Sequence, residues 1–335
     1  MNENRSGCAA PPLTFKQKIY GRKIEFSILI VFAGIFLLYF IGNPRVFSQF
    51  NIYYSFMSTI PMTGIIALFM TFVITLGEID LSFPSIFGLS GWVMATTLMA
   101  TQSLTIGLIA GLVVGVACGL LNSLLIVKFG IPSIVATIGT QFFFNGIVNV
   151  LAQGKGISIL AAQNFADNGV YYAMVGRIGG QVPAQFIWFI GLGILVWFLF
   201  YRHKYGMHVS FVGDNKSSAL MMGVNVSRVR MTAYILVGFF AALCGIISNM
   251  EVVYYYPSQG SGLMLPTLAA VFIGGTSVLG GKGSVLGTFL GALIIGSLEA
   301  GIIAIGINGF WLNVIYGLIL IIAVSIYSFI MKKAT

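Results

Sequence analysis

The sequence predicts an all-α membrane protein, a polytopic helical bundle of about ten transmembrane helices with both termini in the cytosol. Two observations support this fold class. The 335 residues are 58% hydrophobic and only 7% charged, whereas soluble domains average about 25% charged residues. Apolar runs close to the ~20 residues that cross a bilayer also recur along the whole chain. So few charges could not cover a soluble protein of this length, which excludes the soluble classes.

The apolar runs give the expected organisation in order. A cytosolic tail at 1–23 precedes a single transmembrane domain at 24–330, and a short tail follows at 331–335. The expected spans are 24–41, 56–76, 83–99, 104–127, 131–151, 184–201, 231–251, 263–279, 284–305 and 310–330. The runs at 83–99 and 263–279 are short and contain glycine, so either could be a broken or re-entrant element.

The basic residues orient these spans. With a cytosolic N-terminus, all but three of the 17 lysines and arginines fall in cytosolic segments, the exceptions being Arg45, Lys155 and Arg177. Cytosolic loops of membrane proteins carry such an excess of positive charge. This asymmetry places the polar segment 202–230 in the cytosol, and it places 152–183 and 252–262 outside. The three tyrosines in 252–262 are typical of an interfacial aromatic belt, with a docking surface for an external protein as the alternative.

The cytosolic segment 202–230 is the longest polar interruption in the second half of the chain. Asp214 or Asn215 can cap a short helix by accepting backbone N–H bonds. Gly223 can adopt the left-handed conformation that ends such a helix. The helix would leave a small apolar surface outside the lipid, formed by Ala219, Met221 and Met222. A surface of this kind indicates contact with a cytosolic partner protein.

Several polar residues lie in or next to apolar runs. Glu78 and Asp80 end the second run just before Pro84, so Asp80 or Ser82 could cap the next helix. Ionisable groups at membrane depth are costly, so these carboxylates could instead form a gate or line a pathway. Glu299 lies deeper within its span and is a second pathway candidate. Four neutral side chains could either bond across helices or line a path for a hydroxylated solute: Asn122, Gln141, Asn145 and Asn149.

The sequence argues against an enzyme. The stretch around Lys282 approaches the phosphate-loop pattern, but Thr276 stands where the first glycine is required and Gly283 where Ser or Thr is required. His203 and His208 are the only histidines, and they form neither a metal cluster nor a catalytic triad. The net charge of +9 forms no basic stripe, so a nucleic acid partner is not expected.

Three stretches resemble one known family. Residues 77–82 read GEIDLS, residues 213–226 run from Gly-Asp-Asn to Gly-Val-Asn-Val, and residues 274–288 read GGTSVLGGKGSVLGT. Together they are similar to the signatures of the integral membrane permeases of ATP-driven importers for simple sugars, which include ribose, xylose, arabinose and autoinducer-2 systems. The chain departs from that pattern at Glu78 and Pro84, where the family usually has glycine.

The resemblance implies a permease subunit in the bacterial cell membrane that forms a translocation path for a small hydroxylated solute, a monosaccharide above all. A second permease copy or a sister permease would complete the path, and an external solute-binding protein would dock on the outer loops. ATP and Mg²⁺ would bind to a separate ATP-binding subunit and no cofactor to this chain. The residues that would couple to that subunit are Gly213, Asp214, Asn215, Ala219, Met222, Gly223 and Val224. The gate or pathway candidates are Glu78, Asp80, Ser82, Gln141, Asn145 and Glu299.

Two alternatives stay open at this point. Relatives of the same family carry nucleosides or riboflavin, so the solute could differ from a sugar. An ion-coupled secondary transporter is the second alternative, and it would need an ion site near the middle of the bilayer, for which Glu299 is the candidate.

Overall fold

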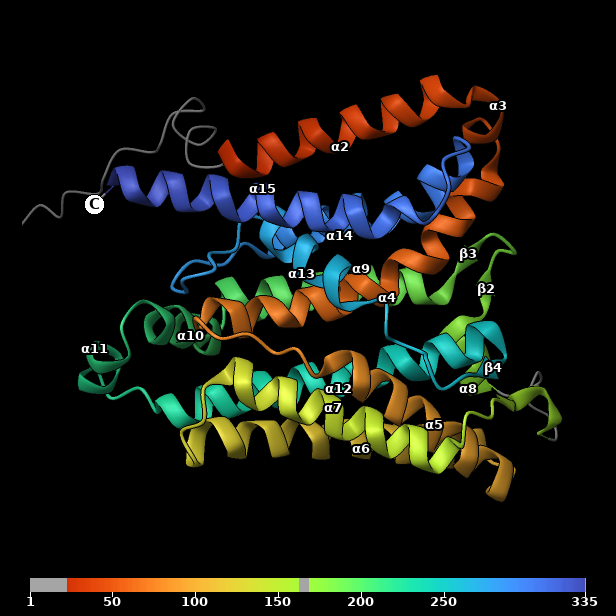
Figure 1. Cartoon of the computed structure of the whole chain (residues 1–335), viewed down its shortest axis with the longest axis horizontal. Coiled ribbons are helices and arrows are strands. Elements are labelled where there is room, and N and C mark those ends of the chain that lie inside the picture. Colours follow the sequence, from red (N-terminus) through yellow and green to blue (C-terminus); the bar gives the residue numbers. More distant parts are fainter. Residues whose placement is uncertain (1–22, 163–168, 335) are drawn as a thin grey trace, which may run out of the picture.

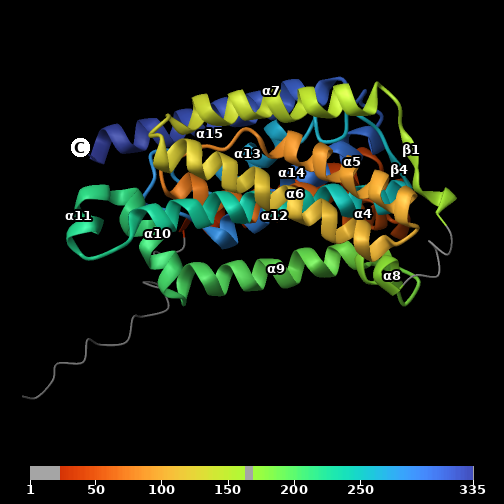
Figure 2. The ribbon, with the colours of Figure 1, turned by 90° about the horizontal axis from the view of Figure 1, so that it is seen from below.

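The computed structural model describes residues 23–162 and 169–334, and this part of the chain is a bundle of α-helices (Figures 1 and 2). The first half contains α2 (Lys23–Gly42), α3 (Pro44–Phe47), α4 (Phe50–Thr75), α5 (Phe83–Thr101), α6 (Leu104–Ser123), the π-helical turn η1 (Leu124–Lys128) and α7 (Ser133–Ala152). The second half contains α8 (Gly169–Val175), α9 (Ala184–Tyr201), α10 (Lys204–Asp214), α11 (Lys216–Met221), α12 (Val226–Val252), α13 (Met264–Ile273), α14 (Val285–Ala304) and α15 (Trp311–Ala334). The predicted tail at 1–23 lies outside the described residues except for Lys23, which begins α2.

The helices confirm the polytopic all-α fold. Seven of those described are long and apolar enough to cross a membrane, namely α4, α5, α6 with η1, α7, α9, α12 and α14. Three shorter apolar helices, Ser27–Gly42, Met264–Ile273 and Trp311–Ala323, lie within the remaining predicted spans. The count of ten crossings is therefore not confirmed. At about 1.5 Å per residue, the ten residues of α13 extend about 15 Å, half the thickness of a bilayer core.

The segment before α13 corrects the prediction that 252–262 is an outer loop. After β4 (Tyr254–Tyr255) the chain turns into the bundle, where Gln259 is only 4% exposed. Gly260 lies so close to the start of α5 that a Cβ there would collide with the carbonyl oxygen of Pro84. Tyr255 is fully buried, so it is not part of an interfacial belt. Within the predicted span at 263–279 only Met264–Ile273 is helical, as α13, so this element is short and broken, whereas the predicted span at 83–99 is the continuous helix α5.

Two sets of three helices follow each other in the same order along the chain but run through the bundle in opposite directions. In each, a long helix (α4 or α12) leads through a non-helical segment to α5 or α13, and then to α6 or α14. Their packing corresponds, since α4 contacts α14 as α12 contacts α6, and α4 contacts α13 as α12 contacts α5. Such inverted repeats, with non-helical segments facing each other inside the bundle, are typical of transporters.

Glycine residues spaced four apart let pairs of helices approach closely. Gly115 and Gly119 of α6 lie against the backbone of α12, where an added Cβ would stand 2.6 Å from a carbonyl oxygen. Gly287 and Gly291 of α14 lie in the same way against α13. Because lipid offers no hydrophobic drive for helix association, such close backbone contact is the main source of packing energy.

The two ends of the bundle differ in character (Figures 1 and 2). The start of α2, the end of α15 and the pair α10–α11 lie at one end, as the cytosolic assignment of 202–230 requires. The other end carries α8, the 3₁₀ turn η2 (Ile159–Ala161) and two short antiparallel sheets. In one, β1 (Ile157–Ser158) pairs with β4, and in the other, β2 (Arg177–Ile178) pairs with β3 (Val182–Pro183). The first sheet joins the two segments predicted to be outside.

Candidate functional site

The short helix predicted in the cytosolic segment is α11, with the caps that the sequence indicates. The Oδ1 atom of Asn215 accepts a hydrogen bond of 2.9 Å from the backbone N–H of Ser218. Gly223 has φ +79°, the left-handed conformation expected after the last turn. A second helix, α10, precedes α11 and was not predicted. His203 caps it, because its Nδ1 accepts a 3.2 Å hydrogen bond from the N–H of Tyr205.

The exposed surface of α11 differs in part from the prediction. Its apolar tip consists of three consecutive residues, Leu220, Met221 and Met222, which are 60%, 87% and 59% exposed. Ala219 is fully buried and Val224 is nearly so, so the prediction that Ala219 contributes to the exposed surface is wrong. Leu220 was missed, although it directly precedes Met221. Asp214, Asn215 and Gly223 are exposed beside the tip.

The hinge between α10 and α11 rests on the turn between α13 and α14. The backbone N–H of Gly281 donates a 2.8 Å hydrogen bond to the carbonyl oxygen of Thr75 at the end of α4. Gly213 is wedged at the same place, since a Cβ on it would collide with that carbonyl oxygen. Gly280 lies against both Gly77 and Gly213. Gly213 is therefore a packing position, and the end of α10 contacts the turns that follow α4 and α13.

Glu78 lies in the turn that follows α4 and binds two cations. One of its oxygens, Oε1, accepts from Arg230 Nε at 2.5 Å and from Lys216 Nζ at 3.3 Å. These are the only ion pairs among the side chains described within 27–162 and 169–323. Lys216 begins α11 and Arg230 lies in the second turn of α12, so Glu78 connects both helices to the α4–α5 turn. Glu78 lines none of the cavities described below, and its role in a gate stays a prediction.

Asp80 and Ser82 form a buried hydrogen-bonded cluster just before α5. Oδ1 of Asp80 accepts from the backbone N–H of Ser82 at 2.8 Å and from its hydroxyl at 2.7 Å. The Nδ2 atom of Asn122 on α6 donates to the Ser82 hydroxyl oxygen at 2.6 Å. Neither side chain bonds an N–H of the first turn of α5, so the capping interpretation is wrong. For Asn122, the structure favours a bond across helices over lining a path.

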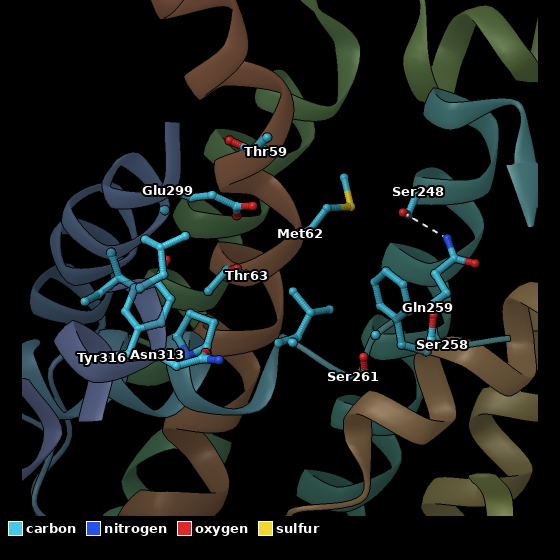
Figure 3. A pocket seen from close by; sticks show the side chains of 18 of the residues that line it. Thr59, Met62, Thr63, Ser248, Ser258, Gln259, Ser261, Glu299, Asn313 and Tyr316 are labelled. Atoms are coloured by element: carbon cyan, nitrogen blue, oxygen red, sulfur yellow. Dashed lines mark hydrogen bonds between the residues drawn. The ribbon is translucent and has the colours of Figure 1, made fainter. Parts of the chain in front are cut away.

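A cavity of about 460 Å³ opens between α4, α13, α14 and α15 on the outer side of the bundle. Figure 3 shows Glu299 of α14 facing it beside Thr59, Met62 and Thr63 of α4. The cavity lies in the outer part of the bundle, because Glu299 and Ser248, which line it, belong to the last turns of α14 and α12 at the outer ends of these helices. The remaining polar side chains of the lining are Tyr256, Ser258, Gln259, Ser261, Asn313 and Tyr316.

A smaller cavity of about 90 Å³ contains the other two pathway candidates. Gln141 and Asn145 of α7 line it together with the start of α5. Asn149 bonds within α7 instead, through a 2.8 Å hydrogen bond from its Nδ2 to Oδ1 of Asn145. Both cavities share Ser258, Gln259 and Ser261, so the non-helical segment before α13 separates Gln141 and Asn145 from Glu299. These three shared residues were missed, and their signal was a polar, glycine-containing stretch beside a short apolar run.

Comparisons with known proteins show that the chain is similar to membrane permeases. Residues 52–324 match the family model described as branched-chain amino acid transport system / permease component. The chain is 35% identical to the ribose import permease protein of Bacillus subtilis over 299 residues, covering 88% of this chain and 90% of the relative. It is 30% identical to the xylose/arabinose import permease protein of Sulfolobus acidocaldarius, covering 94% and 87%. It is 31% identical to the autoinducer 2 import system permease protein of Photorhabdus temperata, covering 90% of each. No solved structure matches the chain.

Proposed function

Because the chain belongs to the family of branched-chain amino acid transport system permease components, we propose that it forms the translocation path for a monosaccharide in an ATP-driven importer. It is a multi-pass subunit of the cell membrane, a permease of an ATP-binding-cassette importer rather than an enzyme. A permease of this kind works with an ATP-hydrolysing subunit and a solute-binding protein. The sugar assignment is supported by relatives that are named for ribose, xylose and arabinose.

The observation that carries the proposal is the chemistry of the outer cavity. Its volume of about 460 Å³ lies in the range of about 300–1,000 Å³ usual for small-molecule sites. Hydroxyl and amide side chains from four separate segments converge on it (Figure 3). Such groups match a solute that carries several hydroxyls, because each can donate or accept a hydrogen bond.

The contacts of α11 suggest how ATP hydrolysis would drive transport. The exposed tip Leu220–Met221–Met222 offers apolar area for the ATP-binding subunit. A displacement of α11 would act on the α4–α5 turn through Glu78, and on the α13–α14 turn through Gly281. The first turn is the non-helical segment of the first inverted triplet, and the second turn is joined through α13 to the non-helical segment of the other triplet. One movement would therefore shift both halves of the bundle and alternate access to the path.

The other partners follow from the same arrangement. A second copy of the chain or a sister permease would complete the path. The outer end, where β1 and β4 join two loops, would receive the solute-binding protein. ATP and Mg²⁺ would bind only to the ATP-binding subunit.

A copurification experiment tests the coupling assignment. The tagged chain is extracted from its native membrane in mild detergent, and Met221→Glu is compared with Leu160→Glu. Leu160 is similarly exposed, at 65%, but lies in η2 at the outer end. We expect an ATP-binding subunit to copurify with the wild type and Leu160→Glu but not with Met221→Glu. Equal recovery from both variants would contradict the assignment.

Uptake into vesicles tests the rest of the proposal. Vesicles holding the purified complex receive labelled ribose, a nucleoside or riboflavin, with and without internal ATP. ATP-dependent uptake of ribose is the expected result. Uptake of the nucleoside or riboflavin alone would change the solute class. Uptake without ATP under a sodium or proton gradient would favour a secondary transporter.

A further inference from the structure

An apolar groove of about 300 Å³ lies between the second half of α9 and the first turns of α14. Every residue that lines it is apolar, including Ile190, Ile194 and Trp197 on one side and Leu286 and Phe289 on the other. Both helices are long and apolar enough to cross a membrane, and Figure 2 shows α9 along one edge of the bundle. Ile194 is 64% exposed and Leu286 42%. The groove therefore opens toward lipid or toward another membrane protein.

The shape of the groove follows from one glycine. Phe289 stacks on Phe189 with 4.5 Å between the ring centres, and its ring lies over Gly193, where an added Cβ would stand 3.0 Å from it. Ile190 and Trp197 lie one turn before and one turn after Gly193, on the same face of α9. The absent side chain at Gly193 thus leaves a narrow slot between larger apolar groups, which suits an extended hydrocarbon chain.

The cytosolic end of the groove is closed by a hydrogen bond and carries an arginine. The backbone N–H of Val285 donates a 3.3 Å hydrogen bond to the Tyr201 hydroxyl oxygen, which joins the start of α14 to the end of α9. Arg202 follows directly, and its guanidinium carbon is 6.0 Å from the centre of the Trp197 ring. Because Trp197 lines the groove, the charge of Arg202 is held close to the cytosolic opening.

A lysine from the turn before α14 adds a second cation at this end. Gly283 lies against the last turn of α9, since a Cβ on it would stand 2.7 Å from the ring of Phe200. This contact brings the preceding residue, Lys282, beside the same end of α9. Lys282 and Arg202 are both exposed, and neither belongs to an ion pair among the side chains described within 27–162 and 169–323. The two charges are therefore available to an external anion.

We propose that this groove binds an anionic phospholipid of the cytosolic leaflet. One acyl chain would lie in the slot over Gly193, and the phosphate would be held by Arg202 and Lys282. Basic residues at this level attract anionic headgroups, and tryptophan and tyrosine are typical of the membrane interface. The bound lipid would join α9 to the α13–α14 turn. Because that turn also contacts the end of α10, the lipid would stabilise the arrangement through which the proposed coupling acts.

The charges favour a lipid over a second copy of the chain. Two copies packed through this face around an axis perpendicular to the membrane would bring the same cations together at the same depth. Like charges that face each other across an interface oppose association. An anionic phospholipid supplies the opposite charge, and its hydrocarbon chain matches a lining without hydrogen-bonding demands.

Quenching of Trp197 fluorescence by brominated lipids tests the proposal at the groove itself. The full-length chain has four tryptophans, and replacing Trp92, Trp188 and Trp311 by Phe leaves only Trp197. This chain is placed in vesicles that contain phosphatidylglycerol or phosphatidylcholine with the same brominated acyl chains. A cation near an anionic lipid strengthens binding roughly 5-fold, so two should give phosphatidylglycerol about a 25-fold advantage in relative binding.

Three variants refine this test. Arg202→Gln combined with Lys282→Gln should remove the preference for phosphatidylglycerol. Lys128→Gln combined with Arg228→Gln is the matched control, because it removes the same charge from exposed cytosolic positions away from the groove, and it should keep the preference. Ile194→Trp, made in a chain in which Trp197 is replaced by Phe, places the fluorophore at an exposed position of the same groove and should report the same preference.

Three results would overturn the proposal. One is equal quenching by the two lipids, and another is a preference that survives in the variant lacking both cations. The third is the absence of quenching by either lipid, which would show that a protein covers the groove. Mass spectrometry of lipids retained by the otherwise unmodified chain in mild detergent gives an independent measurement. We expect less phosphatidylglycerol with Arg202→Gln and Lys282→Gln than with the control pair, and equal amounts would also refute the site.

Discussion

Replacing Glu78 by Gln tests whether the α4–α5 turn moves together with α11, the proposed coupling helix. The change keeps the size of the side chain but removes the charge that Arg230 and Lys216 share. Arg230 is 17% exposed and Lys216 51%, so the two bonds differ in strength. A charge-assisted bond at a largely buried site contributes about 1.5–3 kcal/mol. The pair with half-exposed Lys216 contributes about 0–1 kcal/mol.

The loss in Glu78→Gln should therefore be about 2 kcal/mol of docking free energy between the α4–α5 turn and the two helices that carry Lys216 and Arg230, mostly from the bond to Arg230 on α12. At 1.4 kcal/mol for each factor of ten, this shifts the docking equilibrium about 30-fold. The assay is solute transported per ATP hydrolysed by the assembled importer in vesicles. We expect assembly and ATP hydrolysis to persist in Glu78→Gln while transport per ATP falls strongly.

The exposed fractions of Arg230 and Lys216 also predict which single variant lowers transport per ATP more. Arg230→Gln should resemble Glu78→Gln, whereas Lys216→Gln should reduce transport per ATP by less than about 5-fold. Unchanged coupling in Glu78→Gln would refute the connection through this carboxylate. A Lys216→Gln variant as impaired as Arg230→Gln would refute the argument from burial.

Three further variants test packing, capping and the buried cluster. Gly115→Leu should prevent folding of the bundle, since any side chain there meets the α12 backbone. Gly146→Leu on α7 is the control and should insert normally, because there is open space around Gly146. Fluorescence size-exclusion profiles of the two variants test this expectation. Asn215→Ala removes the cap of α11 and should weaken recovery of the ATP-binding subunit by about 5-fold, from a loss of ~1 kcal/mol; unchanged recovery would show that the cap is dispensable. Asp80→Asn retains an acceptor for Ser82 and should keep most transport, whereas Asp80→Leu should lose it; an equally active Asp80→Leu would exclude any role for the cluster.

Much of the fold could be predicted because lipid imposes simple rules. Apolar runs become helices in a bilayer, since every backbone group must be bonded within its own segment. The span expected at 184–201 coincides with α9. Caps are equally local, so Asn215 and Gly223 were identified from neighbouring residues alone. The stretches that carried the family resemblance are also contiguous in sequence, which is why they were recognisable.

Contacts between distant segments could not be predicted in this way. Glu78 and Arg230 are 152 positions apart, and nothing in either neighbourhood indicates that they form an ion pair. Ala219 seemed part of an exposed surface because its sequence neighbours are exposed, but helix packing turns it inward. The stretch 257–262 looked like an outer loop because it is polar, yet Gln259 and Gly260 pack against the start of α5 and α12 while Ser258 and Ser261 line cavities.

By itself, therefore, the sequence determined the membrane class, the positions of most long helices, the end of α11 and the family. These depend on hydrophobicity, charge and backbone conformation, which act over a few turns of chain. Only the tertiary structure decided which polar residues meet. It grouped Glu78 with the coupling helix, Asp80 with Asn122, and Glu299 with Gln259 around one cavity. The physical reason is that pairing of buried polar groups depends on how helices pack in three dimensions, and this packing is set by many weak contacts along the whole chain.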